Sequence, residues 1–499
     1  MERRPWSRQH SEKEADTMDE KKKLGLPSAI ATGVGLILAT SCLLVIGQGL
    51  SAIGTSFIFS VIIALFFNAF TAISVSELDA LMPRMTGGLA QYSLVGMGPF
   101  MTCLTMVGGY VIGMTVFGSL EGTMFGRTMA MLFPNLHIPL PLYGIVLMAI
   151  IIILNCRGVD MFAKVQDVVA YALIVSLIVM GAMGCFHLGQ GQIVQQDLSF
   201  HASFGQVMGL VGTAFYMFVG CEFVVPLGPF VKNPRRTIPL GMLGSLAVVF
   251  IMQAFCVFGF PNYVSFHDLG SSGSPHMLYG IALLGNFGRY WMGIVSILAV
   301  ISTANTVVNS LGYLTAGMAR LNLLPDVFRR KNRHQAPYVS IIVIGLAMTS
   351  LVIASLVAED LLNFFLKVAC IFWIVVYLFL HVDVILLRKR MPKVPRTFRS
   401  PGGLLIPVLG IVGDVLMIWG IDNSAAMRMK VYIVCGIVFV ILAVYSWYWV
   451  TRVMQKPLFK PYTIKEVMAM ENDKYFEYHP RRRLSALNRI SGGKAPVSP

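Results

Sequence analysis

Charged residues are scarce in this chain. Asp, Glu, Lys and Arg make up 13% of its 499 residues, whereas hydrophobic residues make up 56%. The mean hydropathy of +0.72 is far above that of a water-soluble domain. Apolar segments long enough to cross a bilayer recur along nearly the whole chain. The composition therefore excludes a soluble globular protein and predicts an all-α polytopic membrane protein.

Several motifs that carry chemistry are also missing. The chain has no HExxH zinc-protease motif, no GxSxG nucleophile elbow and no Walker A phosphate loop. Its eight cysteines form neither a CxxC pair nor a Cys/His metal spacing, and nearly all lie inside apolar runs. We therefore predict neither an intramembrane enzyme nor an ATP-driven pump, and no disulfide framework or metal centre.

The net charge of +15 comes from Lys and Arg in short loops and tails rather than from one long basic face. This distribution excludes a nucleic-acid partner and matches the excess of positive residues found in cytoplasmic loops. Basic clusters at 232–236, 329–333 and 388–390 fall on one side of the predicted helices. We predict that this side is cytoplasmic and that the chain is a multi-pass protein of the plasma (inner) membrane.

Polarity divides the chain into three regions. A cytoplasmic tail over residues 1–25 precedes a membrane domain over 26–453, and a second cytoplasmic tail covers 454–499. In that second tail, Thr463 and Glu466 have the spacing of a capping box before a short helix. Twelve spans are predicted in the membrane domain, which places both tails on the same side. These spans lie near 27–52, 55–82, 96–125, 139–156, 160–187, 205–230, 238–260, 280–321, 338–358, 361–388, 404–422 and 430–453.

One stretch places a charge directly after a glycine inside an apolar run. Glu222 follows Gly220 and Cys221 in the middle of a predicted span. A carboxylate at that depth is costly unless it faces protein or water, so it marks a functional site. A membrane helix can break at Gly220, and the freed backbone groups are tolerated only where they line a cavity or bind something.

Five short motifs follow one another along the chain in a fixed order. They are Glu77-Leu78 with Met82-Pro83, Gly87-Gly88 and Tyr92; Leu154-Asn155 with Gly158-Val159 and Gln166; Gly220-Cys221-Glu222 with Lys232-Asn233-Pro234-Arg235-Arg236; Ala319-Arg320 with Leu324-Pro325; and Phe398-Arg399-Ser400-Pro401-Gly402 with Pro407. In this order and spacing they resemble motifs of the amino acid–polyamine–organocation (APC) superfamily of permeases. The resemblance covers about residues 24 to 453.

The resemblance implies the leucine-transporter type of fold, with two inverted five-helix repeats plus two extra helices. In that fold helices one and six are broken near the middle of the membrane, and their half-helix ends hold the substrate's carboxylate and amine. Alignment places the break of helix one at Ala39, Thr40 and Ser41, rather than at the more obvious Gly47 and Gly49. The hydroxyls of Thr40 and Ser41 either reach the ligand or bond back to their own helix.

The resemblance also implies a set of substrate-binding positions. Glu121 either receives a cationic amine or lies solvated near the mouth of its helix. Tyr216 aligns with an aromatic gate and acts either as that gate or in ordinary packing. The full set is Ala39, Thr40, Ser41, Cys42, Phe117, Leu120, Glu121, Tyr216, Phe218, Gly220, Cys221 and Val307.

The coupling residues leave more than one interpretation open. Glu222, which with Tyr216 is assigned to coupling or gating, could move protons, pair with a substrate amine or hydrogen-bond the broken backbone. Leu173 stands where related uniporters and exchangers often place a lysine in a sodium position. Ser302 and Thr303 lie where sodium-coupled members present hydroxyls to the ion, although the same pair could bond within its own helix.

We therefore expect a secondary active transporter that moves amino acids across the membrane by alternating access, with Na⁺ or H⁺ as the coupling ion and no other cofactor. An organic amine or polyamine permease or exchanger is the first alternative, and a non-transporting membrane nutrient sensor is the second. The expected partners are a small-molecule substrate and the lipid bilayer. The choice between uptake and exchange, and the oligomeric state, stay open.

Overall fold

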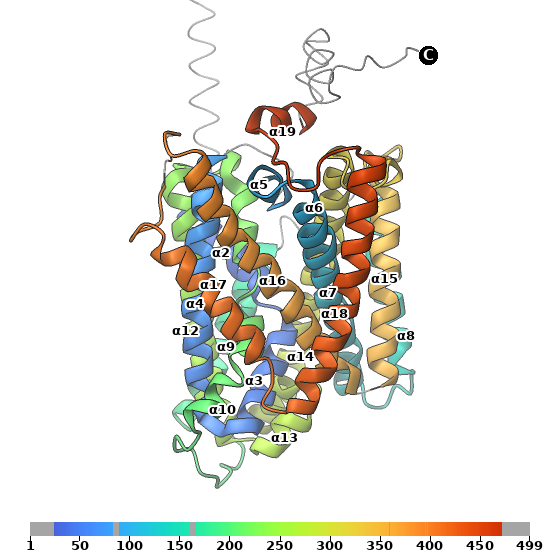
Figure 1. Cartoon of the computed structure of the whole chain (residues 1–499). Coiled ribbons are helices and arrows are strands. Elements are labelled where there is room, and N and C mark those ends of the chain that lie inside the picture. The colour runs from blue at the N-terminus through green and yellow to red at the C-terminus, as the bar shows by residue number, and fades with distance from the viewer. Residues whose placement is uncertain are drawn as a thin grey trace, which may run out of the picture.

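The computed structural model describes residues 24–82, 89–158, 166–358, 360–394, 396 and 398–471. Most of both predicted tails (1–23 and 472–499) lies outside these residues, as do the motif positions Pro83, Gly87, Gly88 and Val159. The described residues form a bundle of helices, with one isolated backbone bridge between Leu24 and Val231. Both ends of the described chain lie on the same side of this bundle, at the top of Figure 1. We call it the terminal side.

The first half of the bundle consists of α2 (Leu26–Ile37), α3 (Thr40–Ile53), η1 (Gly54–Ser56), α4 (Phe57–Leu81), α5 (Leu89–Gly96), α6 (Pro99–Thr102), the π-helical η2 (Cys103–Val111), α7 (Ile112–Leu132), α8 (Leu140–Cys156) and α9 (Gln166–Cys185). The second half consists of α10 (Phe204–Met208), α11 (Val211–Phe215), η3 (Tyr216–Phe218), η4 (Cys221–Phe230), α12 (Pro234–Gly259), η5 (Phe260–Asn262), α13 (Phe266–Ser271), α14 (Pro275–Arg320), η6 (Asp326–Arg329), α15 (Tyr338–Val357), α16 (Asp360–Arg390), α17 (Leu405–Trp419), α18 (Ala425–Tyr448), the π-helical η7 (Trp449–Val453) and α19 (Ile464–Glu471).

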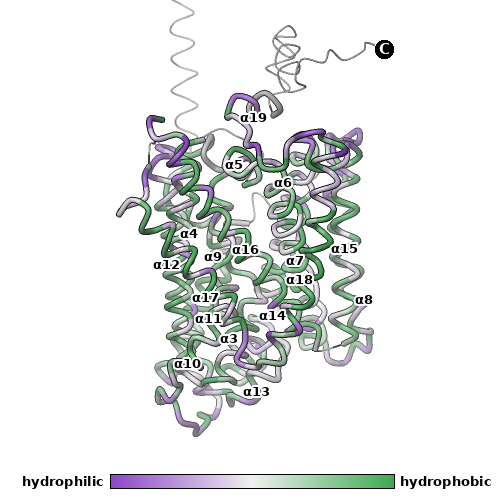
Figure 2. The backbone as a smooth tube through the Cα atoms, viewed as in Figure 1, coloured by the Kyte–Doolittle hydropathy of each residue, from purple (hydrophilic) through white to green (hydrophobic). Residues whose placement is uncertain are grey.

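Long apolar helices make this a multi-pass membrane protein. Within the described residues, 7 helical segments are long and apolar enough to cross a membrane, and further apolar helices are shorter. Figure 2 shows hydrophobic residues along the shafts of the helices and hydrophilic ones gathered towards the two ends. On α18, Ile433, Ile437, Ile441 and Val444 recur at helical spacing and are all exposed, as expected for a face that contacts lipid. The exact count of twelve spans stays a prediction.

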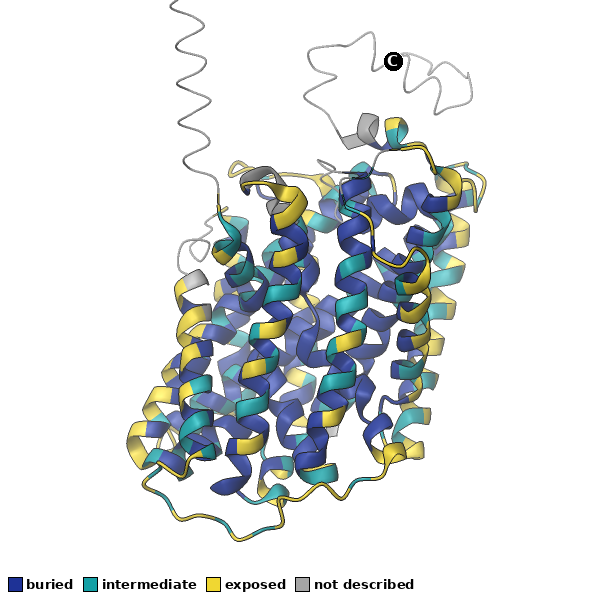
Figure 3. Ribbon diagram, turned by 90° about the vertical axis from the view of Figure 1, so that its left-hand side faces the viewer, coloured by how far each residue is buried: buried dark blue, intermediate teal, exposed yellow. Residues whose placement is uncertain are grey.

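Two groups of packed helices form the core of the bundle. The long α7 helix packs against α8, α14, α15 and α16, whereas α2 packs against α9, α12 and η4. Outside this core, α17 packs on α4 and α16, and α18 packs on η2 and α16. Figure 3 shows the buried residues concentrated in the interior and the exposed ones on the outer helix faces and the connecting loops. Side chains in the centre of the bundle are therefore shielded from the outer helix faces.

The eighth predicted span differs from the structure at its start. The α14 helix begins at Pro275, but Leu284 and Gly285 depart from helical geometry and divide it. Gly285 has φ +60°, a left-handed conformation that a side chain disfavours. The predicted span of 280–321 thus begins before this bend, and the continuous helix follows it.

The short helix predicted in the second tail is confirmed. The Thr463 N–H and hydroxyl both donate to the Glu466 carboxylate, at 2.6 and 2.8 Å, and the Glu466 N–H donates back to the Thr463 hydroxyl at 3.2 Å. This reciprocal pair is a capping box at the start of α19.

Candidate functional site at two helix interruptions

The first membrane helix, which we call helix one and which consists of α2 and α3, is interrupted inside the bundle. The α2 helix ends at Ile37 and α3 begins at Thr40, with Ala39 extended between them at φ −88° and ψ 149°. The interruption lies at the predicted position, and Gly47 and Gly49 lie within α3 instead. The first N–H groups of a helix and its last C=O groups have no partner within that helix. Both new helix ends therefore need hydrogen bonds from elsewhere.

Glu121 of α7 supplies the acceptors for the start of α3. Its carboxylate accepts hydrogen bonds from the Thr40 N–H at 3.1 Å, the Thr40 hydroxyl at 2.6 Å and the Ser41 N–H at 3.0 Å. The side chain is fully buried, so the alternative of a solvated Glu121 at a helix mouth is wrong. A carboxylate at a helix N-terminus also interacts favourably with the helix dipole. Glu121 thus caps α3 from a different helix.

Two further contacts join helix one to helix six, which consists of α11, η3 and η4. The Ser41 and Tyr216 hydroxyls share a hydrogen bond of 2.8 Å. The Cys42 thiol donates to the Ile37 carbonyl at 3.3 Å and lies 3.9 Å from the Tyr216 carbonyl oxygen. Since the hydroxyls of Thr40 and Ser41 bond to Glu121 and Tyr216, the alternative that they only bond back to their own helix is wrong. A hydroxyl pair and a thiol thus connect the two interruptions directly.

Helix six is interrupted at Val219 and Gly220. The helical segments α11 and η3 end at Phe218, Val219 is extended, and η4 begins at Cys221. Gly220 has φ +110°, which glycine adopts without a steric penalty and other residues adopt only under strain. Its N–H donates to the Tyr377 hydroxyl at 3.5 Å. The glycine that suggested a break in the sequence is therefore the residue at which the chain turns.

Glu222 is held by two aromatic side chains of α16. Its carboxylate accepts hydrogen bonds from the Trp373 indole N–H at 3.2 Å and from the Tyr377 hydroxyl at 2.5 Å. Sequence reasoning missed both donors. Trp373 and Tyr377 could have been found from their spacing of four residues, because this spacing places two polar-tipped aromatic side chains on one face of an apolar helix. Glu222 bonds these side chains, and a role in coupling or gating stays a prediction.

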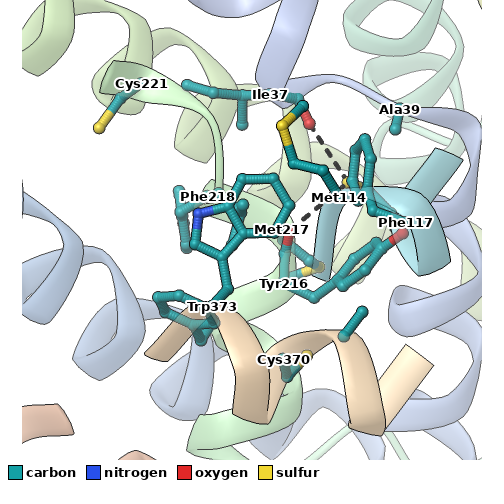
Figure 4. Close-up of a cluster of buried hydrophobic side chains, with 14 of the residues drawn as sticks. Ile37, Ala39, Met114, Phe117, Tyr216, Met217, Phe218, Cys221, Cys370 and Trp373 are labelled. Carbon is teal, nitrogen blue, oxygen red and sulfur yellow. Dashed lines mark hydrogen bonds between the residues drawn. The ribbon is translucent and has the colours of Figure 1, made fainter. Parts of the chain in front are cut away.

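Three aromatic rings pack together beside the groups that bond the two carboxylates. The Phe117 ring lies 5.4 Å from the Tyr216 ring and 5.6 Å from the Trp373 ring, measured between centroids. Figure 4 shows these three side chains in one cluster with Met114, contributed by α7, helix six and α16. Together with Glu121, Glu222, Ser41 and Tyr377 they form what we call the central cluster. It combines two buried carboxylates with aromatic faces.

The remaining predicted positions are buried but contribute no polar contact to this cluster. Leu120, Phe218 and Cys221 are apolar neighbours, and Val307 of α14 packs where Gly118 of α7 has no side chain. Ser302 and Thr303 are also buried in α14, and in the described part of the chain neither hydroxyl makes a hydrogen bond. Their role at an ion stays untested. Among the described residues, no group of three or more His, Cys, Asp or Glu side chains could hold a metal ion.

A second polar group lies towards the terminal side. Glu77 accepts two hydrogen bonds from the Arg388 guanidinium, at 2.7 and 2.6 Å, and two from the N–H and hydroxyl of Ser400, at 2.9 and 2.6 Å. Arg396 adds a second cationic group 3.6 Å from the same carboxylate. Two of the sequence motifs, 77–92 and 398–407, therefore meet in space, a pairing that the sequence did not predict.

Helices interrupted in the interior of a membrane bundle are the architecture of secondary transporters, because their free ends can hold a ligand without exposing backbone to lipid. The fold and this site therefore define a membrane transport protein. The chain belongs to the amino acid permease family, whose family model matches residues 24–453. The APC resemblance is thus confirmed, and the protein is a transporter and not an enzyme.

Relatives of known activity agree with this class. The chain is 23% identical to the branched-chain amino acid permease BcaP of Bacillus subtilis over 84% of its own length and 92% of the relative's. It is 24% identical to the methylthioribose transporter of the same organism, over 78% and 85% of the two chains. A BcaP of Lactococcus lactis subsp. cremoris is 22% identical over 82% and 91%.

A solved structure supports the fold. The crystal structure of the Eremococcus coleocola manganese transporter, in complex with an aromatic bis-isothiourea substituted compound, matches with a TM-score of 0.53 at 11% identity. The match covers 86% of this chain and 94% of the transporter. The leucine-transporter-type fold implied by the motifs is therefore confirmed.

Proposed function

We propose that this protein carries a small nitrogen-containing solute, an amino acid or a related organic amine, across the membrane by alternating access. The ligand binds in the central cluster, where the interruptions of helices one and six meet. The observation that supports this best is the Ser41–Tyr216 hydrogen bond of 2.8 Å, which joins the two interrupted helices beside the buried Glu121. Relatives named for branched-chain amino acids and for methylthioribose show that homologues of this size carry different small solutes.

The contacts suggest which parts move together. On the terminal side, the Lys232 N–H donates to the Leu24 carbonyl at 2.9 Å, so the start of helix one is tied to the end of helix six. The half-helices α2 and η4 also pack on each other. On the opposite side, α3 packs against α13. In this proposal α2 and η4 move as one unit against α7, α14 and α16, with the interruptions as hinges and the ligand between them.

The distribution of charge supports an orientation. The described basic residues near the ends of α8, α14 and α16 and at the start of α12 all lie on the terminal side, in agreement with the positive-inside rule. We infer that the terminal side is cytoplasmic and that the membrane is the plasma (inner) membrane. Topology reporters fused after residue 471 and in the loop at 187–203 test this orientation directly.

A vesicle assay tests the carrier itself. The purified full chain is reconstituted in liposomes, and uptake of labelled amino acids and amines is measured. We expect uptake into the lumen by the wild type and its loss in Ser41→Trp, because an indole at this buried position fills the space between the interrupted helices. Ser350→Trp, on an exposed face of α15, is the matched control. Binding without uptake would instead support a membrane sensor.

A further inference from the structure

The starting observation is that Glu121 already occupies the anion-binding end of α3. The first N–H groups of a helix point out of its N-terminus. Together with the helix dipole they act as a charge of about +0.5 elementary charge, which attracts anions. In this chain the Thr40 and Ser41 N–H groups both donate to the Glu121 carboxylate, at 3.1 and 3.0 Å, and the Thr40 hydroxyl adds a third bond at 2.6 Å. Both carboxylate oxygens are engaged.

A ligand carboxylate therefore meets two obstacles at this position. It would have to take over N–H donors that Glu121 already holds. It would also place a second negative charge beside a fully buried one, where the low dielectric strengthens repulsion. An amino acid in its zwitterionic form carries such a carboxylate.

The charge of Glu121 is balanced only in part by the protein. Its hydrogen-bond donors are the neutral backbone and hydroxyl of Thr40 and the neutral backbone of Ser41. Of the ion pairs within the described part of the chain, none includes Glu121. A buried carboxylate is unfavourable unless a cation or enough hydrogen bonds compensate it. The N-terminus of α3 offsets part of the negative charge of Glu121, and a cationic ligand would offset the rest.

The neighbours of Glu121 also suit a cation. Phe117 precedes it by four residues on the same face of α7, and its ring contacts those of Tyr216 and Trp373 at 5.4 and 5.6 Å between centroids. Faces of aromatic rings attract ammonium groups. The Trp373 indole N–H in turn donates to Glu222, a second buried carboxylate, which also accepts from the neutral Tyr377 hydroxyl. Hydrogen bonds and ring contacts thus link two buried carboxylates with three aromatic rings, and Figure 4 shows these rings together.

We propose that Glu121 is a specificity-determining residue that takes the place of a substrate carboxylate, so that the ligand is an organic amine without a free carboxylate group. The inference rests on the proposed function, since it assigns the ligand class of the same central cluster. The ammonium group lies against Glu121 and the aromatic faces, and the rest of the ligand is apolar or carries a second amine.

Matched pairs of ligands test this inference without any variant. Each pair contains an amine and the amino acid that differs from it only by the carboxylate: phenethylamine and phenylalanine, isoamylamine and leucine, cadaverine and lysine. The purified full chain is melted with increasing concentrations of each compound, and vesicles with the reconstituted chain report uptake. We expect at least one amine to raise the melting temperature and enter the vesicles, at concentrations at least tenfold below those at which its amino acid does so.

A variant adds a second readout. Glu121→Gln is expected to weaken binding of the effective amine at least tenfold and to reduce the discrimination against its amino acid. Asp326→Asn removes one exposed negative charge on the terminal side and should change neither. If the amino acids bind the wild type as tightly as the amines, or more tightly, the inference is overturned while the carrier function stands. If neither class is bound or taken up, the proposed function fails, and the inference fails with it.

Discussion

Two buried carboxylates, Glu77 and Glu121, have opposite surroundings. Glu77 faces the Arg388 guanidinium at 2.7 and 2.6 Å and a second arginine, Arg396, at 3.6 Å. Among the described residues, Glu121 faces the neutral donors of Thr40 and Ser41 and no cation. Within that part of the chain, arginines balance the charge of Glu77, and no cation balances that of Glu121. We infer that Glu77 holds two helices together, whereas the uncompensated charge of Glu121 can attract a cationic ligand.

The largest effect is expected from breaking the balanced pair. Arg388→Ala leaves Glu77 buried without its two-bond partner, and the loss of one member of a buried ion pair costs about 3–5 kcal/mol. We expect a corresponding fall in thermal stability of the purified protein. Arg330→Ala, at an exposed position on the same side, is the control. Replacement of both members, Glu77→Met with Arg388→Met, should recover most of the stability. A stable Arg388→Ala variant would show that Glu77 is not structural.

Substitution of Glu222 is expected to have a smaller effect on stability. Like Glu121, Glu222 accepts hydrogen bonds from neutral donors, but its two donors are side chains of α16. In Glu222→Gln the amide can still accept from Trp373 and donate to Tyr377, so only the charge assistance is lost, about 1 kcal/mol. We expect transport to slow at least tenfold and its pH profile to change. Transport with an unchanged rate and pH profile would remove Glu222 from the mechanism.

The smallest effect on stability is expected at hydroxyls that make no hydrogen bond within the described residues. Ser302→Ala with Thr303→Ala removes two polar groups that we propose bind sodium, in a chain whose Leu173 supplies no substitute cation. We expect the melting temperature to stay near that of the wild type and the apparent sodium affinity to fall about tenfold, or about 1.4 kcal/mol. Uptake driven only by a pH gradient, with no response to these substitutions, would favour proton coupling.

The helices could be predicted from the sequence because their signals are local and periodic, whereas the fold was implied by the resemblance of the motifs to the APC superfamily. Apolar runs located the helices, and alignment with the APC superfamily placed the interruption beside Ala39 although no glycine stands there. Gly220 could be predicted since only glycine accepts its backbone conformation without strain. These features depend on residues that are close in the chain.

The contacts of the buried carboxylates could be predicted only in part. Glu121 and Thr40 are 81 residues apart, and Glu77 and Arg388 are 311 apart. A single sequence carries no signal for pairs this distant, because each side chain reads as an isolated charge in an apolar helix. For the same reason Trp373 and Tyr377 were not predicted as partners of Glu222. Their importance comes from the donor groups that they aim at Glu222.

The most direct test compares substitutions of the two carboxylates, Glu77 and Glu121, in one experiment. The Glu77→Gln and Glu121→Gln variants are melted without ligand and with the amine that binds the wild type best, at about 100 times its Kd, where binding should contribute about 2.7 kcal/mol. We predict that Glu77→Gln melts well below the wild type and keeps the ligand-induced shift. Glu121→Gln turns an amide NH2 towards a donor of Thr40 or Ser41 and leaves that donor unpaired, at a cost of about 1–3 kcal/mol. We expect it to melt above Glu77→Gln and to lose most of the ligand-induced shift. The reverse pattern, with the shift intact in Glu121→Gln, would contradict the account.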